Sequence, residues 1–295
     1  MEKILLTGAT GFLGSHLIPK LLEYNYSILA YKRPSSSLEK CAAFSDKITW
    51  YDSQNLEQPF REHAKIHHIL HLATCYGRNE ETISHIIETN FLFPMRLLEL
   101  GIRYQVDNFI NADTFWPEAL SDYSASKAQF LAWLKILADT NRINPVRLIN
   151  LKIEHMYGPG DSGKKFIPYV VSACLRNQTI KLTDGEQSRD FIYIDDVVSA
   201  FIVILKTVFT FEAGLTVFAV GSAESVLIKD IVKKIHMMTN SHSELLFGAI
   251  KKREHEPDSS VADITELTAL GWFPQYSLHL GLQKMIEIER GNHDV

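Results

Sequence analysis

Apolar residues in the first half of the chain alternate between short runs and longer patterns with helical spacing. The short runs predict strands at residues 3–6, 27–31, 48–51, 66–72, 108–111 and 146–152. The longer patterns predict helices at residues 12–23, 82–100 and 123–139. Strands that alternate with helices are typical of right-handed βαβ units. We therefore expect an α/β fold with a doubly wound parallel sheet, whose ligands bind beyond the carboxyl ends of the strands.

The second half of the chain has a less regular pattern. It predicts helices at residues 166–176 and 195–207, and short strands at residues 179–182 and 216–220. The sequence contains no internal repeat, low-complexity tract or linker rich in proline and serine between the halves. We therefore expect a second, smaller lobe rather than a tethered domain.

Three glycines, Gly8, Gly11 and Gly14, join the first predicted strand to the first predicted helix. Glycine here permits a tight turn, the approach of a pyrophosphate to bare amides, and close packing of helix on strand. The helix N-terminus adds partial positive charge. This spacing predicts a Rossmann-type dinucleotide site, and a tight turn without a ligand is the alternative. The predicted cofactor contacts are Gly8, Thr10, Gly11, Phe12, Leu13 and Gly14.

Two cations, Lys32 and Arg33, follow the second predicted strand. In proteins that bind NAD(H), an acidic side chain at this place accepts a hydrogen bond from the free ribose 2′-hydroxyl. Charge-assisted hydrogen bonds from these side chains suit a 2′-phosphate. We therefore expect NADP(H) as the preferred cofactor, with NAD(H) still possible. The alternative interpretation is a solvated basic turn.

Tyr123 and Lys127 stand four residues apart in a predicted helix, so their side chains share one face. An ammonium near a phenol lowers the phenol pKa toward the range useful for acid and base catalysis. Thr114, just beyond the fifth predicted strand, is a candidate hydroxyl for holding a carbonyl with Tyr123. It is otherwise an ordinary loop threonine, since Ser121 and Ser124 are also near.

Charge and composition narrow the classes of partner. Lys and Arg number 30 against 35 Asp and Glu, for a net charge of -5, which excludes a general attraction to nucleic acid or to anionic membrane. The 3 cysteines support neither a disulfide framework nor a cysteine zinc site, and a reducing cytoplasm fits best. No apolar segment is long enough to span a membrane.

A metal site is not expected, although His63, His67, His68 and His71 lie close in sequence. His67 and His71 share a face of the predicted fourth strand. At 3.3 Å per residue they sit about 13 Å apart, which is too far for one zinc ion.

Several motifs in family order resemble the extended short-chain dehydrogenase/reductases that act on nucleotide-sugars, the NAD-dependent epimerase/dehydratase family. Besides the glycines, they are residues 123–127 (YSASK), 157–160 (YGPG) and 189–197 (RDFIYIDDV). More narrowly, the chain resembles the CDP-abequose and CDP-paratose synthases. The segments that carry this likeness are 75–78 (CYGR), 154–158 (EHMYG), 165–168 (KFIP) and 185–191 (GEQSRDF). The resemblance covers essentially the whole chain.

The resemblance implies reduction of the 4-keto group of a CDP-4-keto-3,6-dideoxyhexose with NADPH. The product is CDP-abequose or CDP-paratose, for the sugars of O-antigen and lipopolysaccharide. One alternative is a nucleotide-sugar 4-epimerase that retains NAD, against which the basic pair Lys32 and Arg33 argues. A further alternative is a dinucleotide-sensing protein without catalysis, against which the intact tyrosine and lysine argue.

The resemblance also assigns residues. Catalytic positions are Thr114, Tyr123 and Lys127, further cofactor contacts are Asp52, Leu72 and Ala73, and substrate contacts are Thr114, Arg189 and Arg253. Two departures from the family pattern are threonine in place of serine at position 114 and Glu154 in place of arginine. The implied dinucleotide-binding domain covers residues 1–163 and about 189–221, and the implied nucleotide-sugar lobe covers about 164–188 and 222–295. A homodimer built on the helices at 82–100 and 123–139 is also implied.

Overall fold

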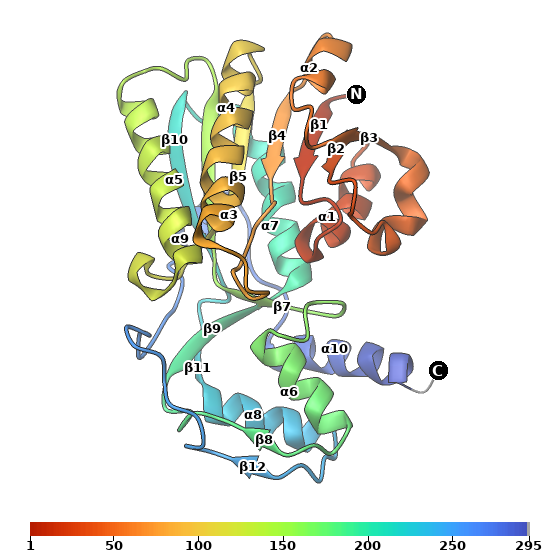
Figure 1. Cartoon of the computed structure of the whole chain (residues 1–295), viewed down its shortest axis with the longest axis vertical. Coiled ribbons are helices and arrows are strands. Elements are labelled where there is room, and N and C mark those ends of the chain that lie inside the picture. The colour runs from red at the N-terminus through yellow and green to blue at the C-terminus, as the bar shows by residue number, and fades with distance from the viewer. Residues whose placement is uncertain (294–295) are drawn as a thin grey trace. The chain divides into compact units, whose positions relative to one another are not determined.

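Seven strands form one sheet in the order β10-β6-β5-β4-β1-β2-β3 in the computed structural model, which describes residues 1–293 (Figure 1). The strands are β1 (Lys3–Thr7), β2 (Ser27–Lys32), β3 (Ile48–Asp52), β4 (His68–His71), β5 (Asn108–Thr114), β6 (Arg147–Ile153) and β10 (Gly214–Val220). The pairings of β1 with β2 and β4, of β2 with β3, and of β4 with β5 are parallel. From β3 to β6 the order is that of a Rossmann sheet.

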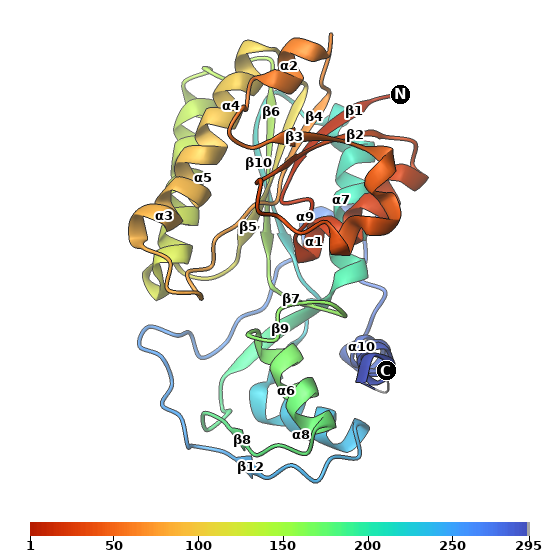
Figure 2. The ribbon, with the colours of Figure 1, turned by 45° about the vertical axis from the view of Figure 1, so that its right-hand side comes forward.

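Helices cover both faces of this sheet (Figure 2). One layer contains α1 (Phe12–Glu23) and α7 (Ile194–Thr207), and the other contains α3 (Ile83–Ile87), α4 (Phe93–Arg103) and α5 (Asp122–Asp139). Short helices lie at α2 (Gln58–Glu62) and in 3₁₀ turns at Glu39–Lys47, Glu118–Leu120 and Val208–Thr210. The expected α/β fold with a doubly wound sheet is therefore confirmed.

Strands β1, β2, β4, β5 and β6 are buried on both faces, which explains why their sequences read as apolar runs without alternation. Strands β1 to β6 all contribute side chains to a single core cluster, among them Leu5, Leu29, Tyr51, Ile69, Phe109 and Leu148. Helices α4 and α5 close this cluster with Leu97, Leu98, Phe130 and Leu134. This core fixes the strand ends that carry the candidate site.

Two predicted elements end differently in the structure. The strand expected at 66–72 is only β4 (His68–His71), because the backbone N–H groups of Leu72 and Ala73 donate to the Thr7 hydroxyl. The helix expected at 82–100 is present as continuous helical backbone from Ile83 to Arg103, but it is not a regular α-helix throughout. A π-helical turn at Glu88–Leu92 separates α3 from α4, and Asn90 in that turn is fully buried and bonded to Cys75.

The remaining strands form two small sheets. In the order β11-β9-β7, β9 (Ser188–Tyr193) pairs with β7 (His155–Tyr157) in parallel and with β11 (Ser225–Leu227) antiparallel. The strands β8 (Ile180–Lys181) and β12 (Leu245–Leu246) form a parallel pair. The helices of this part of the chain are α6 (Phe166–Leu175), α8 (Ile228–Met238), α9 (Thr265–Ala269) and α10 (Leu278–His293).

The chain divides into two units, the first formed by Met1–Lys152 and Val198–Phe218, and the second by Ile153–Val197 and the chain from Ala219 onwards. The sequence places residues 153–163 and about 189–197 with the first part, whereas here they pack with the second. The pairing of β9 with both β7 and β11 is the physical reason. The assignment of one ligand to each part stays a prediction. Within residues 1–293, no helix has the length and apolar character needed to cross a membrane.

Candidate active site

The glycine-rich turn between β1 and α1 leaves its backbone open for close approach. Gly8 has a φ of +69°, and a Cβ atom there would lie 2.7 Å from the backbone N of Ala73. A Cβ atom on Gly14 would lie 2.3 Å from the carbonyl O of Gly8. The predicted contacts Thr10, Phe12 and Leu13 stand in the same turn and the start of α1. A side chain at Gly8 or Gly14 would collide with neighbouring backbone, so this tight turn requires glycine there, as a dinucleotide-binding turn does.

Thr7, at the end of β1, ties this turn to the end of β4. Its hydroxyl oxygen accepts from the N–H groups of Leu72 and Ala73, each at 3.1 Å. Both lone pairs are then used, so its proton goes to Nδ1 of His71 at 2.9 Å, and the histidine proton sits on Nε2. The N–H groups of Leu72 and Ala73 are thus engaged by Thr7.

A polar pocket of about 290 Å³ lies beside the glycine-rich turn. Its lining residues are Thr10, Arg33, Ser35, Ser36, Ser37, Glu39 and Lys40. Of the two cations predicted from the sequence, the pocket includes Arg33 and not Lys32. The sequence analysis missed the three serines, Glu39 and Lys40, although the polar run after β2 pointed to them. Two cations and several hydroxyls suit a phosphate, whereas Glu39 opposes one.

Lys32 and Asp52 are register partners at the carboxyl ends of β2 and β3. The Asp52 carboxylate accepts from the backbone N–H of Gln54 at 2.9 Å, which shapes the turn after β3. Asp52 is exposed. Both residues therefore stand at the edge of the sheet where the sequence placed them.

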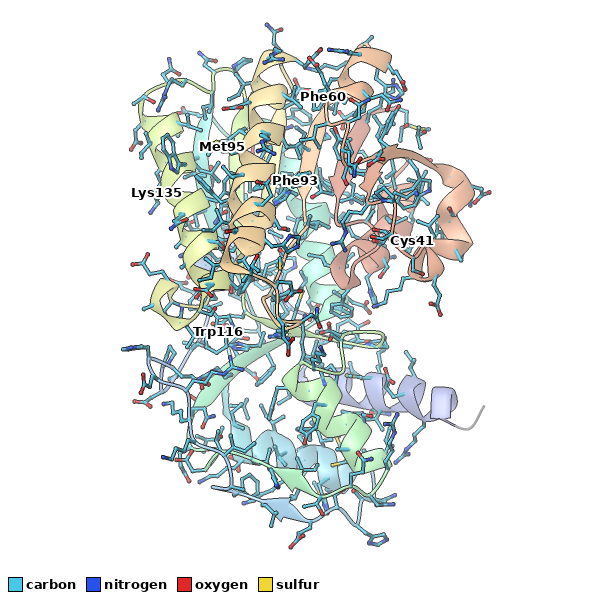
Figure 3. All side chains as sticks on the ribbon, in the orientation of Figure 1. Cys41, Phe60, Phe93, Met95, Trp116 and Lys135 are labelled. Atoms are coloured by element: carbon cyan, nitrogen blue, oxygen red, sulfur yellow. The ribbon has the colours of Figure 1, made fainter. Side chains whose placement is uncertain are left out.

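Thr114, Tyr123 and Lys127 come together at the end of β5. Ser121 caps α5 by a reciprocal pair of hydrogen bonds with Ser124, which starts the helix just before Tyr123. A side-chain hydrogen bond links Thr114 with Tyr123. Trp116, labelled in Figure 3, donates its backbone N–H to Oγ1 of Thr114 at 3.2 Å. Ser121 and Ser124 are thus committed to the helix cap, which leaves Thr114 as the hydroxyl beside the phenol.

Lys127 is 1% exposed, and its Nζ donates to the carbonyl O of Ala112 at 2.9 Å. Burial lowers the pKa of Lys127 to about 8, and the charge of Asp113 acts in the opposite direction. The predicted lowering of the Tyr123 pKa is wrong. Burial raises the pKa of Tyr123 well above its ordinary value, and the charge interaction with the Tyr76 hydroxyl adds to this. The loss of hydration around the phenolate is the physical reason.

The loop after β4 supplies neighbours of Tyr123 that the sequence analysis missed. The ring of Tyr76 packs on Tyr123, and Cζ of Arg78 lies 5.1 Å from the centre of the Tyr76 ring. Asn90 clamps the loop, because its side chain bonds both the N–H and the carbonyl of Cys75 at 2.8 Å. It also donates to Ser126 of α5 at 3.0 Å. The signal in the sequence was Asn90 itself, a polar residue within a helical pattern of apolar residues.

The predicted substrate contacts Arg189 and Arg253 belong to the second unit. Arg189 is 2% exposed, and its guanidinium donates to a Glu256 carboxylate oxygen at 2.6 Å. Arg253 is exposed in the chain segment before Glu256. Glu154, one of the departures from the family pattern, is buried and accepts from the hydroxyl of Ser260 at 3.2 Å. Burial raises the pKa of Glu154.

The described residues contain no group of three or more His, Cys, Asp and Glu side chains placed to hold a metal ion.

Residues 4–221 match the model of the NAD dependent epimerase/dehydratase family. The chain belongs to this family. It is 38% identical over 294 residues to a CDP-abequose synthase of Salmonella muenchen, with 98% of each chain covered. It is 32% identical over 295 residues to a CDP-abequose synthase of Salmonella typhimurium, with 97% of this chain and 98% of the relative covered.

Among solved structures, UDP-glucose 4-epimerase of Thermotoga maritima with UDP-glucose has a TM-score of 0.83 and 25% identity, and 99% of each chain is covered. The expected family, and with it an NAD(P)-dependent nucleotide-sugar enzyme, is therefore confirmed. The individual site residues stay predictions.

Proposed function

We propose that this protein reduces the 4-keto group of a CDP-4-keto-3,6-dideoxyhexose with NADPH, to give CDP-abequose or CDP-paratose for O-antigen synthesis. The observation that carries the proposal is that Thr114, Tyr123 and Lys127 come together at the carboxyl end of β5. The glycine-rich turn follows the carboxyl end of β1 in the same sheet. The identity of 38% to a protein named CDP-abequose synthase supports the choice of substrate.

In this mechanism the hydroxyls of Thr114 and Tyr123 hold the carbonyl oxygen, and Tyr123 donates its proton to it. The bound nicotinamide supplies the hydride. Burial keeps the Tyr123 pKa above its ordinary value, so the phenol is protonated at neutral pH. That is the form that a ketone reduction consumes, whereas the oxidation that opens an epimerase cycle needs a base. Lys127 brings a positive charge that stabilises the phenolate left behind.

Preference for NADPH over NADH rests on the polar pocket. Arg33 and Lys40 supply two cations, and Ser35, Ser36 and Ser37 supply hydroxyl donors, for the 2′-phosphate. Glu39 in the same pocket reduces the preference and is the acid that a free 2′-hydroxyl of NADH would meet. Lys32 and Asp52 flank the adenosine part of either cofactor in this proposal.

Arg189 and Arg253 are proposed as contacts of the anionic CDP moiety. Arg189 is already buried against Glu256, so its charge is partly neutralised before a diphosphate binds. We therefore expect Arg253, which is exposed, to contribute more of the attraction.

The direct experiment follows NADPH absorbance after mixing the protein with CDP-4-keto-3,6-dideoxyglucose. We expect turnover in the wild type, and a loss of about 100-fold or more in Tyr123→Phe. Tyr169→Phe, at a tyrosine that is 42% exposed on α6, is the matched control and keeps full activity. Turnover on another nucleotide-sugar alone would reassign the substrate.

A second candidate is a nucleotide-sugar 4-epimerase, favoured by the likeness to the Thermotoga maritima enzyme at 25% identity. Such an enzyme retains its cofactor through the cycle. Stoichiometric NAD in the purified protein, together with conversion of a 4-epimer pair without net NADPH use, would establish it. A dinucleotide-sensing protein without catalysis would bind the cofactor and turn over neither substrate.

We also propose a homodimer in the cytoplasm. The helical layer of α3, α4 and α5 exposes Ile83, Leu92, Trp133 and Ile136, with exposed fractions from 37% to 59%. Large apolar side chains gathered on one layer suit a second copy of the chain. Light scattering after size exclusion is expected to give twice the mass of 33.6 kDa, and Trp133→Glu to give the monomer mass. A monomeric wild type overturns the proposal.

A further inference from the structure

A chain of buried polar side chains links β5 and β6, which are neighbours in the sheet. Asn111 donates from its amide to Oδ1 of Asn150 at 2.6 Å, and Asn150 donates to Oδ2 of Asp113 at 2.8 Å. The exposed fractions of these three residues are 1%, 0% and 6%. The chain of hydrogen bonds therefore ends on a buried carboxylate that the proposed reaction does not use.

Both oxygens of Asp113 accept hydrogen bonds, since the backbone N–H of Thr114 donates to Oδ1 at 2.7 Å. A carboxylate that only accepts is in its charged form, because a protonated one must donate through its own O–H. Burial alone raises the pKa of Asp113, and the charges of Lys127 and Lys152 act against that rise. A buried charge of this kind is held by opposite charge and by donors.

Lys127 is the cation that we pair with the buried Asp113 carboxylate. Its ammonium is buried and has the Ala112 carbonyl as its hydrogen-bond acceptor. A carbonyl dipole alone is a weak partner for a buried ammonium. Ala112, whose carbonyl accepts from Lys127, is the residue before Asp113 in β5, so the buried Asp113 carboxylate is the negative charge near this lysine and favours its charged form.

We propose that Asp113 is the positioning residue of the tyrosine–lysine pair: its carboxylate is the counter-ion of the buried Lys127 ammonium and anchors the backbone of Thr114. This inference rests on the proposed function for the roles of Lys127 and Thr114. Asp113 contacts neither substrate nor cofactor in this account. The strand geometry explains the double action, because Asp113 and Thr114 are consecutive residues whose side chains point to opposite sides of β5.

Charged and titratable groups face this pair from four elements. Lys127 interacts through its charge with Asp113 from β5 and His71 from β4, and it lies one turn from Tyr123 in α5. Asp113 meets Lys152 from β6 as well as Lys127. The hydroxyl of Tyr123 meets Asp113, Thr114, Tyr76 and Arg78. Among these groups Asp113 is the one whose charge favours the ammonium.

The test uses the full chain with Asp113→Asn, which keeps the size of the side chain and removes its charge. Lysine labelled with carbon-13 at Cε reports the titration of Lys127, and the signal is assigned by its loss in Lys127→Arg. We expect the midpoint for Lys127, about 8 in the wild type, to fall by about one unit or more in the variant. An unchanged midpoint overturns the proposal. This measurement needs no substrate, so it stands even if the proposed substrate is wrong.

Kinetics supply a second readout. With active substrate, Asp113→Asn is expected to keep a larger share of wild-type kcat at about pH 6 than at about pH 8, because the lysine loses its proton earlier. The control is Asp107→Asn, which removes another aspartate paired with a lysine, Lys65 at 2.8 Å, before the start of β5. A uniform loss of kcat at both pH values would show a structural role only and would overturn the proposal.

A third comparison covers the case in which Asp113→Asn folds poorly. Lys127→Met leaves the Asp113 carboxylate buried without its counter-ion. The double variant Lys127→Met with Asp113→Asn is therefore expected to unfold at a higher temperature than Lys127→Met alone. An equal or lower unfolding temperature contradicts the pairing.

Discussion

The ring of Tyr76 lies 4.9 Å from the ring of Tyr123, measured between centroids, with 46° between the two planes. Tyr76 comes from the loop after β4 and Tyr123 from the first turn of α5. Asn90 holds both segments, since it bonds Cys75 next to Tyr76 and Ser126 one turn from Tyr123. The catalytic phenol of the proposed reaction is thus covered by a loop that a buried asparagine clamps.

Replacing Tyr76 by Ala is expected to move the alkaline limb of the pH profile for kcat to lower pH. The charge interaction with the Tyr76 hydroxyl raises the Tyr123 pKa, and the Tyr76 ring packs on the Tyr123 ring. Removing this side chain therefore removes that interaction, rehydrates the phenol and lowers its pKa. Loss of the aromatic contact also costs about 0.5–1.5 kcal/mol of stability. Tyr76→Phe keeps the ring and removes only the hydroxyl, so it separates the charge interaction from the rehydration. A profile that stays in place in the alanine variant contradicts the role of Tyr76.

Replacing Arg33 by Ala is expected to weaken NADPH binding about 10-fold to 100-fold and to leave NADH binding nearly unchanged. The reason is the loss of one charge-assisted hydrogen bond to the 2′-phosphate, worth about 1.5–3 kcal/mol. Titration calorimetry with both cofactors measures the two constants. Glu39→Gln, in the same pocket, is expected to shift the preference the other way, toward NADPH. Equal losses for both cofactors in Arg33→Ala would argue against a 2′-phosphate site.

Replacing Gly14 by Ala is expected to destabilise the fold by about 1–3 kcal/mol and to abolish dinucleotide binding. The added Cβ meets the backbone O of Gly8 at 2.3 Å and backbone atoms of Ala9 at 2.8 Å, none of which moves cheaply. Gly163→Ala is the control, because a Cβ there meets nothing within 4 Å. Chemical denaturation and cofactor titration measure both effects. Wild-type binding in Gly14→Ala would refute the close packing of this turn.

The stability of the protein is expected to fall as the pH drops below about 6.5, with His71 as one cause. Burial and the nearby Lys127 charge hold the His71 pKa well below its ordinary value, so the folded chain keeps this histidine neutral while the unfolded chain protonates it. The contribution is complete above the unfolded pKa and is lost below it, by at most about 1.4 kcal/mol per pH unit. Denaturation at several pH values should show that the free energy of unfolding falls less steeply with decreasing pH in His71→Asn than in the wild type. The same pH dependence in both proteins would exclude His71 as a cause.

The parts of the site that the sequence predicts are those carried by local spacing. The three glycines and the Tyr123–Lys127 pair are set by single turns of backbone, so their residue types and intervals are visible in the chain. The sequence does not predict the roles of Tyr76, Asn90 and Asp113, because these roles come from contacts between segments that are distant in sequence. Nothing periodic marks the loop after β4, and a polar residue within an apolar run does not reveal its partner.

The same distinction explains the electrostatics. A nearby ammonium predicts a lowered phenol pKa, but the sequence does not show how deeply the Tyr123 hydroxyl is buried, and burial decides the direction. Only part of the pocket beside Arg33 could be predicted from the sequence, for a similar reason. The cations after β2 stand out in the sequence, whereas Glu39 and Lys40 reach the pocket only through the 3₁₀ turn at Glu39–Lys47.

The central claim is a net hydride transfer to C4 of a CDP-linked 4-keto sugar, with Tyr123 as the proton donor. The most direct measurement incubates the protein with CDP-4-keto-3,6-dideoxyglucose and NADPH deuterated at C4 of the nicotinamide, and reads the sugar product by NMR. We predict one deuterium at C4 of the sugar for each NADPH consumed, a single C4 epimer, and no product in Tyr123→Phe. A mixture of C4 epimers without deuterium and without net NADPH consumption would contradict the reductase and support the epimerase.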